Sequence, residues 1–156
     1  MKDKISRRSF LAAAAVSAAA LAVTGCDAKT SKKAVTDITV WNYYNGDQLE
    51  SFNRLVSTFN ETIGKAKGIR VSGSSQGTVN DLEANVMDAA EGKVGSAEMP
   101  TIFAAYADTA YKLDQMGMVV DLKDYLTEDE KAAFVPGYIT EGDFDGSGSI
   151  KIFPVA

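Results

Sequence analysis

The fold is indicated first by residues 38–71, which read ITVWNYYNGDQLESFNRLVSTFNETIGKAKGIRV. Ile38–Trp41 is a β-branched, alternating run that predicts a strand. Gln48–Ile63 then repeats apolar side chains at helical spacing and predicts an amphipathic helix. Gly64 is expected to end this helix, and Gly68–Ser72 predicts a second strand. The stretch therefore predicts a strand–helix–strand unit.

The same alternation continues along the chain. Thr78–Ala90 predicts a second helix, with Thr78 and Asp81 as its capping pair. Pro100–Tyr106 predicts a third, fully buried strand, and Thr109–Met116 predicts a short helix that Gly117 closes. Strands that alternate with helices in this way imply an α/β fold, a three-layer arrangement in which helices cover both faces of a mainly parallel sheet.

The last part of the chain has weaker signals. A capping pattern predicts a helix over Thr127–Phe134, and Pro136–Gly137 is expected to break or turn the chain. Asp143–Gly148 reads as a polar hairpin turn that leads to a strand over Ile150–Val155. The sequence stops on that strand without a cap or a polar tail, so we expect the chain to be the first part of a longer one.

Composition limits the classes of function. The 156 residues suit one globular domain, and they include 16 Lys and Arg against 21 Asp and Glu, for a formal net charge of −5. Such a balance is unfavourable for binding a nucleic-acid backbone, so we expect no nucleic-acid partner. The sequence has no His, the commonest general base and transition-metal ligand.

The first 25 residues have the pattern of an export signal peptide. Residues 1–8 carry four basic side chains, and Phe10–Val23 is an uncharged run that is too short to span a bilayer. Ser6–Leu11 (SRRSFL) is similar to the twin-arginine export motif, but the general export route is equally open. We expect residues 1–25 to be removed.

Cys26 is the only cysteine and follows the apolar run directly. Val23–Cys26 (VTGC) is similar to the bacterial lipobox, in which the cysteine becomes the new N-terminus and carries a lipid. The alternative is an unmodified, buried thiol. Residues 26–36 lack apolar periodicity and predict a flexible tether, which leaves residues 37–156 for the folded domain.

Several segments, in order behind the lipobox, resemble one protein family. They are Ile38–Tyr44, the helix Phe52–Asn60, Gly68–Val71, Ala104–Asp108 and Gly117–Leu122. Together they resemble the carbohydrate-type (family 1) extracellular solute-binding proteins of bacterial ABC importers.

The resemblance implies a periplasmic-binding-protein-like fold (type II) of two α/β lobes joined by a hinge. Residues 37–156 would be a partial N-terminal lobe, with the second lobe missing. It also implies a receptor that is anchored through Cys26 to the outer face of the cytoplasmic membrane. Such a receptor binds a solute, here most simply a sugar or oligosaccharide, and delivers it to the permease subunits of the importer. We expect no enzymatic activity and no cofactor.

The loop after the first predicted strand suits sugar binding. Tyr43 and Tyr44 can stack on a sugar ring, while Asn45 and Asp47 can hydrogen-bond its hydroxyls. The structural alternative is that residues 45–47 only cap the following helix. Trp41, at the end of the strand, is expected in the core.

Two further loops supply polar candidates. Ser75 and Gln76 offer a hydroxyl and an amide before the second helix, where they could bind a solute or an anion, or form only a flexible turn and cap. Tyr106 and Asp108 follow the third strand, where the family resemblance implies polar ligand contacts. Asp108 could instead cap the next helix.

Other functions find less support in the sequence. Asp143–Gly146 resembles a calcium loop, but the position that needs a bidentate Glu is Ile152, so we expect no metal site. A secreted glycoside hydrolase would need two carboxylates, for which Asp47 and Asp108 are the candidates. A surface scaffold lipoprotein is the third alternative.

Overall fold

The structure is a computed structural model that describes residues 34–155. The expected signal peptide 1–25, Cys26 and tether residues 27–33 lie outside the described residues. Within residues 34–155, no helix combines the length and the apolar character that crossing a membrane requires.

Three parallel strands form one sheet in the order β2-β1-β3. β1 (Thr36–Asn42) is central and pairs along its whole length with β2 (Ile69–Ser75). β3 (Ile102–Phe103) pairs only with Val40 and Trp41 near the end of β1. The prediction of a parallel α/β sheet is confirmed.

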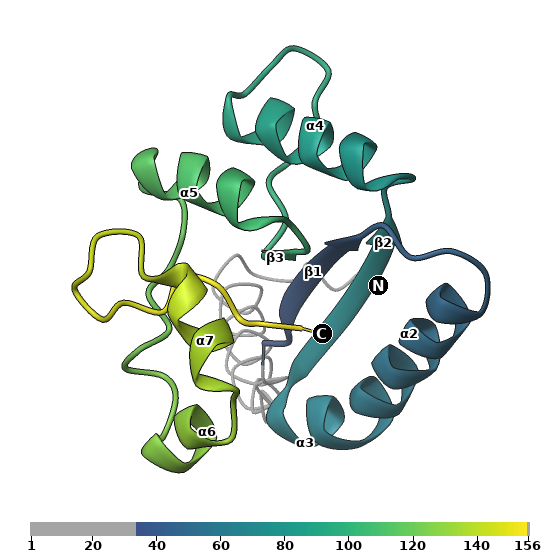
Figure 1. Cartoon of the computed structure of the whole chain (residues 1–156). Coiled ribbons are helices and arrows are strands. Elements are labelled where there is room, and N and C mark those ends of the chain that lie inside the picture. Colours follow the sequence, from purple (N-terminus) through teal and green to yellow (C-terminus); the bar gives the residue numbers. More distant parts are fainter. Residues whose placement is uncertain (1–33, 156) are drawn as a thin grey trace, which may run out of the picture. The chain divides into compact units, whose positions relative to one another are not determined.

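Helices connect and flank these strands (Figure 1). Their bounds are α2 (Gly46–Phe59), the π-helical turn η1 (Asn60–Gly64), α3 (Lys65–Lys67), α4 (Val79–Ala90), α5 (Ala107–Gln115), α6 (Glu128–Ala132), α7 (Pro136–Ile139) and the 3₁₀ turn η2 (Thr140–Gly142).

Different helices cover the two faces of the sheet. On one face, the Phe52 ring of α2 fills the space that a side chain at Gly73 of β2 would need. Gly73 pairs with Val40, so Trp41, the next residue of β1, points to the opposite face. There the buried Trp41 packs in one cluster with three fully buried side chains of α4 and α5, namely Leu82, Val86 and Leu113. The three layers and the core position of Trp41 are confirmed.

The third strand differs from its prediction. The expected buried strand over Pro100–Tyr106 is wrong, because only two residues join the sheet and Ile102 is exposed. Just before β3, side chains take over the hydrogen bonding: Thr101 N–H donates to Thr39 Oγ1 (2.9 Å), and Thr39 N–H donates to Thr101 Oγ1 (3.2 Å). These hydroxyls satisfy the two amides, so strand pairing does not extend further.

The N-terminal caps of α4 and α6 are those that the sequence predicts. The Thr78 hydroxyl accepts the Asp81 N–H, and the Asp81 carboxylate accepts the Thr78 N–H at 2.9 Å. Thr127 and Glu130 form the same reciprocal capping box on α6. Hydrogen bonds from Thr78 hold the pKa of Asp81 below its ordinary value. Both predicted capping pairs are confirmed.

The end of the first helix was predicted wrongly at Gly64. The helix continues through η1 and α3, and ends at Gly68, whose φ of 72° is left-handed. Gly64 is instead buried inside η1, where a Cβ would lie 2.6 Å from the Ile69 carbonyl oxygen. Gly64 is therefore required by close packing, whereas Gly68 is the residue that stops the helix.

The last part of the chain agrees with one prediction and differs from another. The break expected at Pro136–Gly137 is confirmed, because α6 ends at Ala132 and Pro136 occupies the first turn of a new helix, α7, where its missing N–H costs nothing. The expected strand over Ile150–Val155 is wrong, because none of these residues joins the sheet. Its first residue is held by Asp121, whose carboxylate accepts the Ile150 N–H at 2.9 Å. The Leu122 N–H also donates to the Ile150 carbonyl (2.8 Å), so Asp121 and Leu122 together hold this segment outside the sheet.

Candidate functional site

The predicted site residues follow the carboxyl ends of the three strands. Because the strands are parallel and in register, with Asn42 beside Ser75 and Trp41 beside Phe103, the loops after them meet at one edge of the sheet. We refer to this as the carboxyl edge: residues 43–47, 75–78 and 104–108. It brings all eight predicted ligand-binding residues to the same end of the fold.

Hydrogen bonds join the first two loops directly. The Gln76 N–H donates to the main-chain carbonyl of Asn42 (2.8 Å), and the Ser75 hydroxyl donates to the carbonyl of Tyr44 (2.8 Å). Ser75 is the last residue of β2 rather than part of a flexible turn. These bonds fix the two loops relative to each other.

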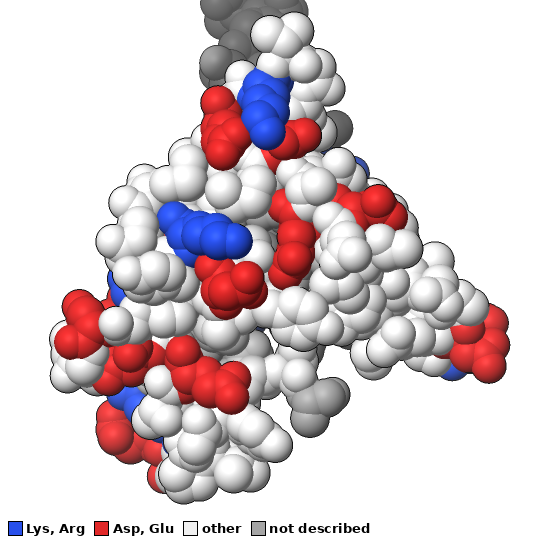
Figure 2. All heavy atoms as spheres, turned by 45° about the horizontal axis from the view of Figure 1, so that its top comes forward, with Lys and Arg blue, Asp and Glu red and all other residues white. Residues whose placement is uncertain are grey.

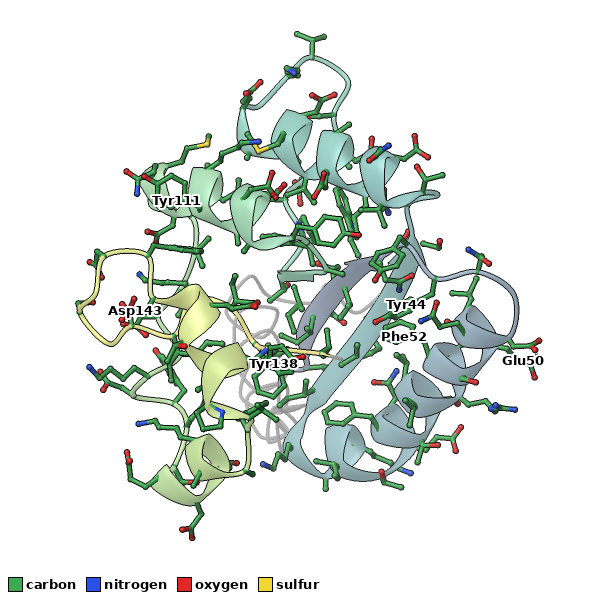
Figure 3. All side chains as sticks on the ribbon, in the orientation of Figure 1. Tyr44, Glu50, Phe52, Tyr111, Tyr138 and Asp143 are labelled. Atoms are coloured by element: carbon green, nitrogen blue, oxygen red, sulfur yellow. The ribbon has the colours of Figure 1, made fainter. Side chains whose placement is uncertain are left out.

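The rings of Tyr43, Tyr44 and Phe52 form a row of aromatic neighbours. The ring centroids of Tyr43 and Tyr44 are 5.4 Å apart. Those of Tyr44 and Phe52, both labelled in Figure 3, are also 5.4 Å apart. Tyr43 packs against the core cluster around Trp41, whereas Tyr44 lies against α2. Both rings are half-buried. Each residue therefore keeps part of its surface accessible to solvent.

Asn45 and Asp47 are exposed at the start of α2. Asn45 has the extended backbone of an N-cap residue, but its side chain makes no capping hydrogen bond. Asn45 is therefore the N-cap residue, as the capping interpretation predicts, but its side chain does not cap the helix. The amide of Asn45 and the carboxylate of Asp47 thus face solvent at the edge.

Tyr106 and Asp108 occupy the third loop and the first turn of α5. Tyr106 is 65% exposed and takes the N-cap position, so the alternative that Asp108 caps this helix is wrong. Asp108 lies one residue into the helix, and its carboxylate is 3.8 Å from the Lys112 ammonium. Both side chains are exposed.

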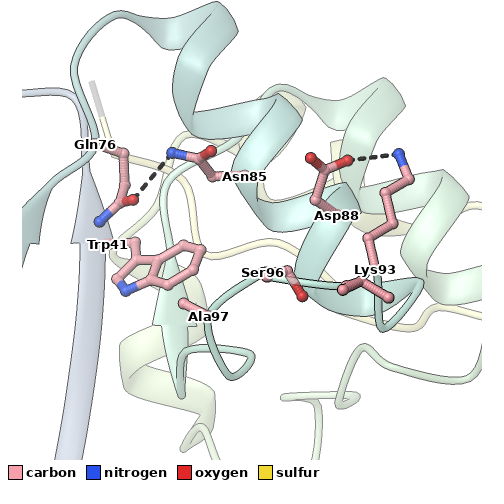
Figure 4. A pocket seen from close by; sticks show the side chains of 9 residues that line it. Trp41, Gln76, Asn85, Asp88, Lys93, Ser96 and Ala97 are labelled. Atoms are coloured by element: carbon pink, nitrogen blue, oxygen red, sulfur yellow. Dashed lines mark hydrogen bonds and ion pairs between the residues drawn. The ribbon is translucent and has the colours of Figure 1, made fainter.

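Gln76 connects the edge to a surface pocket of about 360 Å³ (Figure 4). Its Oε1 accepts a hydrogen bond from Asn85 of α4 (3.1 Å), and its Nε2 donates to the Ser74 hydroxyl (2.9 Å). The pocket is lined by Trp41, Gln76, Asn85, Asp88 and residues 93–97.

Sequence reasoning missed most of this pocket. The Lys93 ammonium is 2.6 Å from Asp88 and 3.1 Å from Glu91, and the bonds to these carboxylates raise its pKa. Asn85 of α4 is exposed and Asp88 is partly exposed. The chain turns after the helix at Gly92, which has a positive φ, and Lys93 reaches back to Asp88. The one sequence signal for this pocket is a polar stretch with two glycines, Gly92 and Gly95, directly after the predicted helix.

The helix N-terminus beside Gln76 already holds a carboxylate of the chain itself. The Asp81 carboxylate already accepts the Thr78 N–H and hydroxyl there, at 2.9 and 2.7 Å. A second negative charge would lie close to this carboxylate. The cap at Thr78 is confirmed, whereas solute binding by Ser75 and Gln76 stays a prediction.

The carboxylates of Asp143 and Asp145 accept hydrogen bonds from N–H groups of their own loop. The carboxylate of Asp143 accepts the N–H groups of Gly148 (3.1 Å) and Ser149 (3.3 Å), and that of Asp145 accepts the Ser147 N–H (3.0 Å). The bonds to Ser147 lower the pKa of Asp145. Within residues 34–155, no three His, Cys, Asp or Glu side chains are grouped to hold a metal ion.

Some known proteins share this arrangement of strands and helices. Neither the family models nor the curated proteins that were searched match the sequence. Solved structures do match: the cyclic alpha-maltosyl-1,6-maltose binding protein from Arthrobacter globiformis superposes with a TM-score of 0.59 at 20% identity, over 72% of this chain. The fold is that of one lobe of a periplasmic-binding-protein-like solute-binding protein.

Two further structures agree. CpMnBP1, solved with mannotriose bound, covers 74% of the chain with a TM-score of 0.55 at 15% identity. A family 1 extracellular solute-binding protein from Bifidobacterium longum subsp. infantis covers 76% with a TM-score of 0.54 at 16% identity. The matched part is 27% of the length of each of these three chains. At such identities the likeness shows the fold, and the expected resemblance is confirmed at that level.

Proposed function

We propose that the protein is the N-terminal lobe of an extracytoplasmic receptor that binds a sugar or oligosaccharide for an ABC importer. The observation that carries this proposal is the carboxyl edge itself, where two half-buried tyrosines lie beside exposed amide and carboxylate groups. Aromatic faces with a few placed polar groups are what neutral sugars require. Two structural neighbours with this fold are named for an oligosaccharide.

The charge of the protein favours a neutral solute. Acidic side chains, red in Figure 2, are spread over the face drawn there, and the net charge is −5. An anionic solute would meet Asp47 and Asp108 at the edge and Asp81 beside it. We therefore propose an uncharged, polyhydroxylated ligand.

Five carboxylates in the described residues have pKa values that do not suit a glycosidase acid. A glycosidase needs one carboxylic acid whose pKa is raised so that it can donate a proton. The carboxylates with a shifted pKa in the described part of the chain are all lowered, which keeps them ionised. These are Asp81, Asp121, Glu128, Glu130 and Asp145.

A sugar titration tests whether the protein binds a sugar. Thermal unfolding should be followed with maltotriose, mannotriose and, as a non-sugar control, trialanine. We expect at least one sugar to raise Tm in proportion to the logarithm of its concentration, and trialanine to leave Tm unchanged. Hydrolysis of chromogenic glycosides, or a response to the peptide alone, would contradict the proposal.

The envelope location is a second part of the proposal. We propose that residues 1–25 are a cleaved signal peptide and that a lipid on Cys26 anchors the tether 26–36 to the outer face of the cytoplasmic membrane. Cys26→Ser should move the protein from the membrane fraction to the soluble fraction. Ser31→Cys in that background restores a thiol outside the lipobox and should not restore membrane binding.

The length of the mature protein can be measured directly. An antibody raised against residues 37–156 should detect a band well above the 16.6 kDa of this chain if a second lobe follows. A band at or below that mass would contradict a two-lobed receptor, and permease delivery with it. In that case, the protein should not co-purify with membrane permease subunits.

A further inference from the structure

Asn42 is a buried polar residue that sequence reasoning did not select. It is the last residue of β1 and is only 1% exposed. Its Oδ1 accepts the N–H of Tyr44 at 3.1 Å, which closes a turn directly after the strand. Its main-chain carbonyl accepts the Gln76 N–H at 2.8 Å. One residue thus links the tyrosine loop to the loop after β2.

The side-chain amide of Asn42 makes its burial costly. Its Nδ2 has no hydrogen-bond partner, although it is shielded from solvent. An apolar side chain of similar size would avoid this penalty at the end of a strand. The bond from Oδ1 to the loop is therefore the interaction that an asparagine gains here.

That bond acts on the position of Tyr44. The Tyr44 backbone is held on both sides, its N–H by Asn42 and its carbonyl by the Ser75 hydroxyl. Its ring then lies between Tyr43 and Phe52. Release of the N–H would allow the turn to open and both tyrosine rings to reorient.

We infer that Asn42 is a positioning residue: through Oδ1 it fixes the turn that presents Tyr43 and Tyr44 at the carboxyl edge. The part of this inference that concerns ligand affinity rests on the proposed sugar site. The part that concerns the turn does not, so the two can be tested separately.

The test compares Asn42→Leu, which removes the acceptor, with Asn42→Asp, which keeps it, in the full chain. Hydrogen exchange of the Tyr44 amide should quicken by tenfold or more in Asn42→Leu, while the Val86 amide in α4 stays protected. Asn42→Asp should retain the protection of Tyr44. Unchanged exchange at Tyr44 in Asn42→Leu would overturn the inference.

Ser75→Ala keeps the test decisive if Asn42→Leu does not fold. Ser75 is exposed, and its removal frees only the carbonyl of Tyr44. The Tyr44 amide should stay protected in this variant. Loss of its protection would show that Ser75 rather than Asn42 holds the turn, and would overturn the inference.

Sugar affinity gives the functional readout. With maltotriose and mannotriose as probes, Asn42→Leu should weaken binding by tenfold or more and Asn42→Asp by no more than a few-fold. Full affinity in a Leu variant that has lost Tyr44 protection would overturn the part of the inference that concerns ligand affinity. If the wild-type protein binds neither sugar, the proposed function fails, whereas the exchange experiment still decides the role of Asn42.

Discussion

Asn60 and Val71 bond each other in both directions. Asn60 Nδ2 donates to the Val71 carbonyl (2.8 Å), and the Val71 N–H donates to Asn60 Oδ1 (2.8 Å). Asn60 opens the π-helical turn η1, and Val71 lies in β2, eleven positions later. Because Val71 is half-buried, this pair satisfies two main-chain groups and sets where the long helix lies against the strand that follows it.

Asn60→Ala should destabilise the protein measurably. The substitution removes both hydrogen bonds and leaves the two main-chain groups of Val71 without their partner. We expect a loss of about 2 kcal/mol in the free energy of unfolding, measured by urea denaturation. Asn53→Ala, on the exposed side of α2, is the matched control and should change stability by less than about 0.5 kcal/mol. Equal effects of the two variants would show that the Asn60 bonds contribute nothing net.

Gly64→Ala and Gly137→Ala should have opposite signs. Both glycines are in helical turns, where alanine is intrinsically better by about 1 kcal/mol. At Gly64 the new Cβ would lie 2.6 Å from the Ile69 oxygen and 2.9 Å from the Phe59 ring, so overpacking of about 1–3 kcal/mol should outweigh the gain. At Gly137 nothing lies within 4 Å, so a small gain in stability is expected.

Thermal and urea unfolding of the two variants measure these signs. A stabilised Gly64→Ala protein would mean that the α3–β2 connection relaxes at no cost. A destabilised Gly137→Ala protein would mean that the Pro136–Ile139 turn needs the freedom of glycine.

Sequence patterns predicted the features that depend on neighbouring residues. The period of the apolar side chains located β1, β2 and α4, and the reciprocal pairs Thr78–Asp81 and Thr127–Glu130 located two helix starts, because a capping box needs only residues three positions apart. The parallel sheet followed from the alternation of these elements. The gathering of the predicted site residues at one edge follows from the same topology.

Features that depend on distant residues were predicted wrongly or missed. Gly64 looks like a helix stop, but the bonds between Asn60 and Val71 and the packing of Gly64 on Ile69 carry the helix further. Ile150–Val155 has strand composition, yet Asp121 takes its first N–H. The pocket beside Gln76 forms because residues 93–97 return to α4. The local spacing of apolar residues does not predict this return.

Stability should fall in acid partly through Asp121. Its carboxylate accepts the N–H groups of Ile150 and Lys123, both at 2.9 Å, and these bonds lower its pKa in the folded protein. A lowered pKa contributes stability that is full above the unfolded value of about 3.9 and is lost as pH falls through the folded value. Asp121→Asn should therefore flatten the decline in the free energy of unfolding below about pH 4.

The control for this titration is Asp124→Asn, which removes the same charge from an exposed side chain of the same segment. Urea denaturation between pH 2 and pH 7 compares the two. A profile of Asp121→Asn as steep as that of Asp124→Asn would contradict a contribution from Asp121.

The candidate sugar site should depend on residues from two different loops. If a sugar stabilises the wild-type protein, a concentration about 100 times its Kd should add about 2.7 kcal/mol to the free energy of unfolding. Tyr43→Ala combined with Asp108→Ala should abolish this gain, because it removes an aromatic face and a carboxylate from the carboxyl edge. Asp124→Ala combined with Tyr125→Ala removes the same two kinds of side chain from exposed positions elsewhere, and should keep the full gain. Loss of the gain in both double variants would reflect general damage, and its retention in the first would place the sugar away from the carboxyl edge.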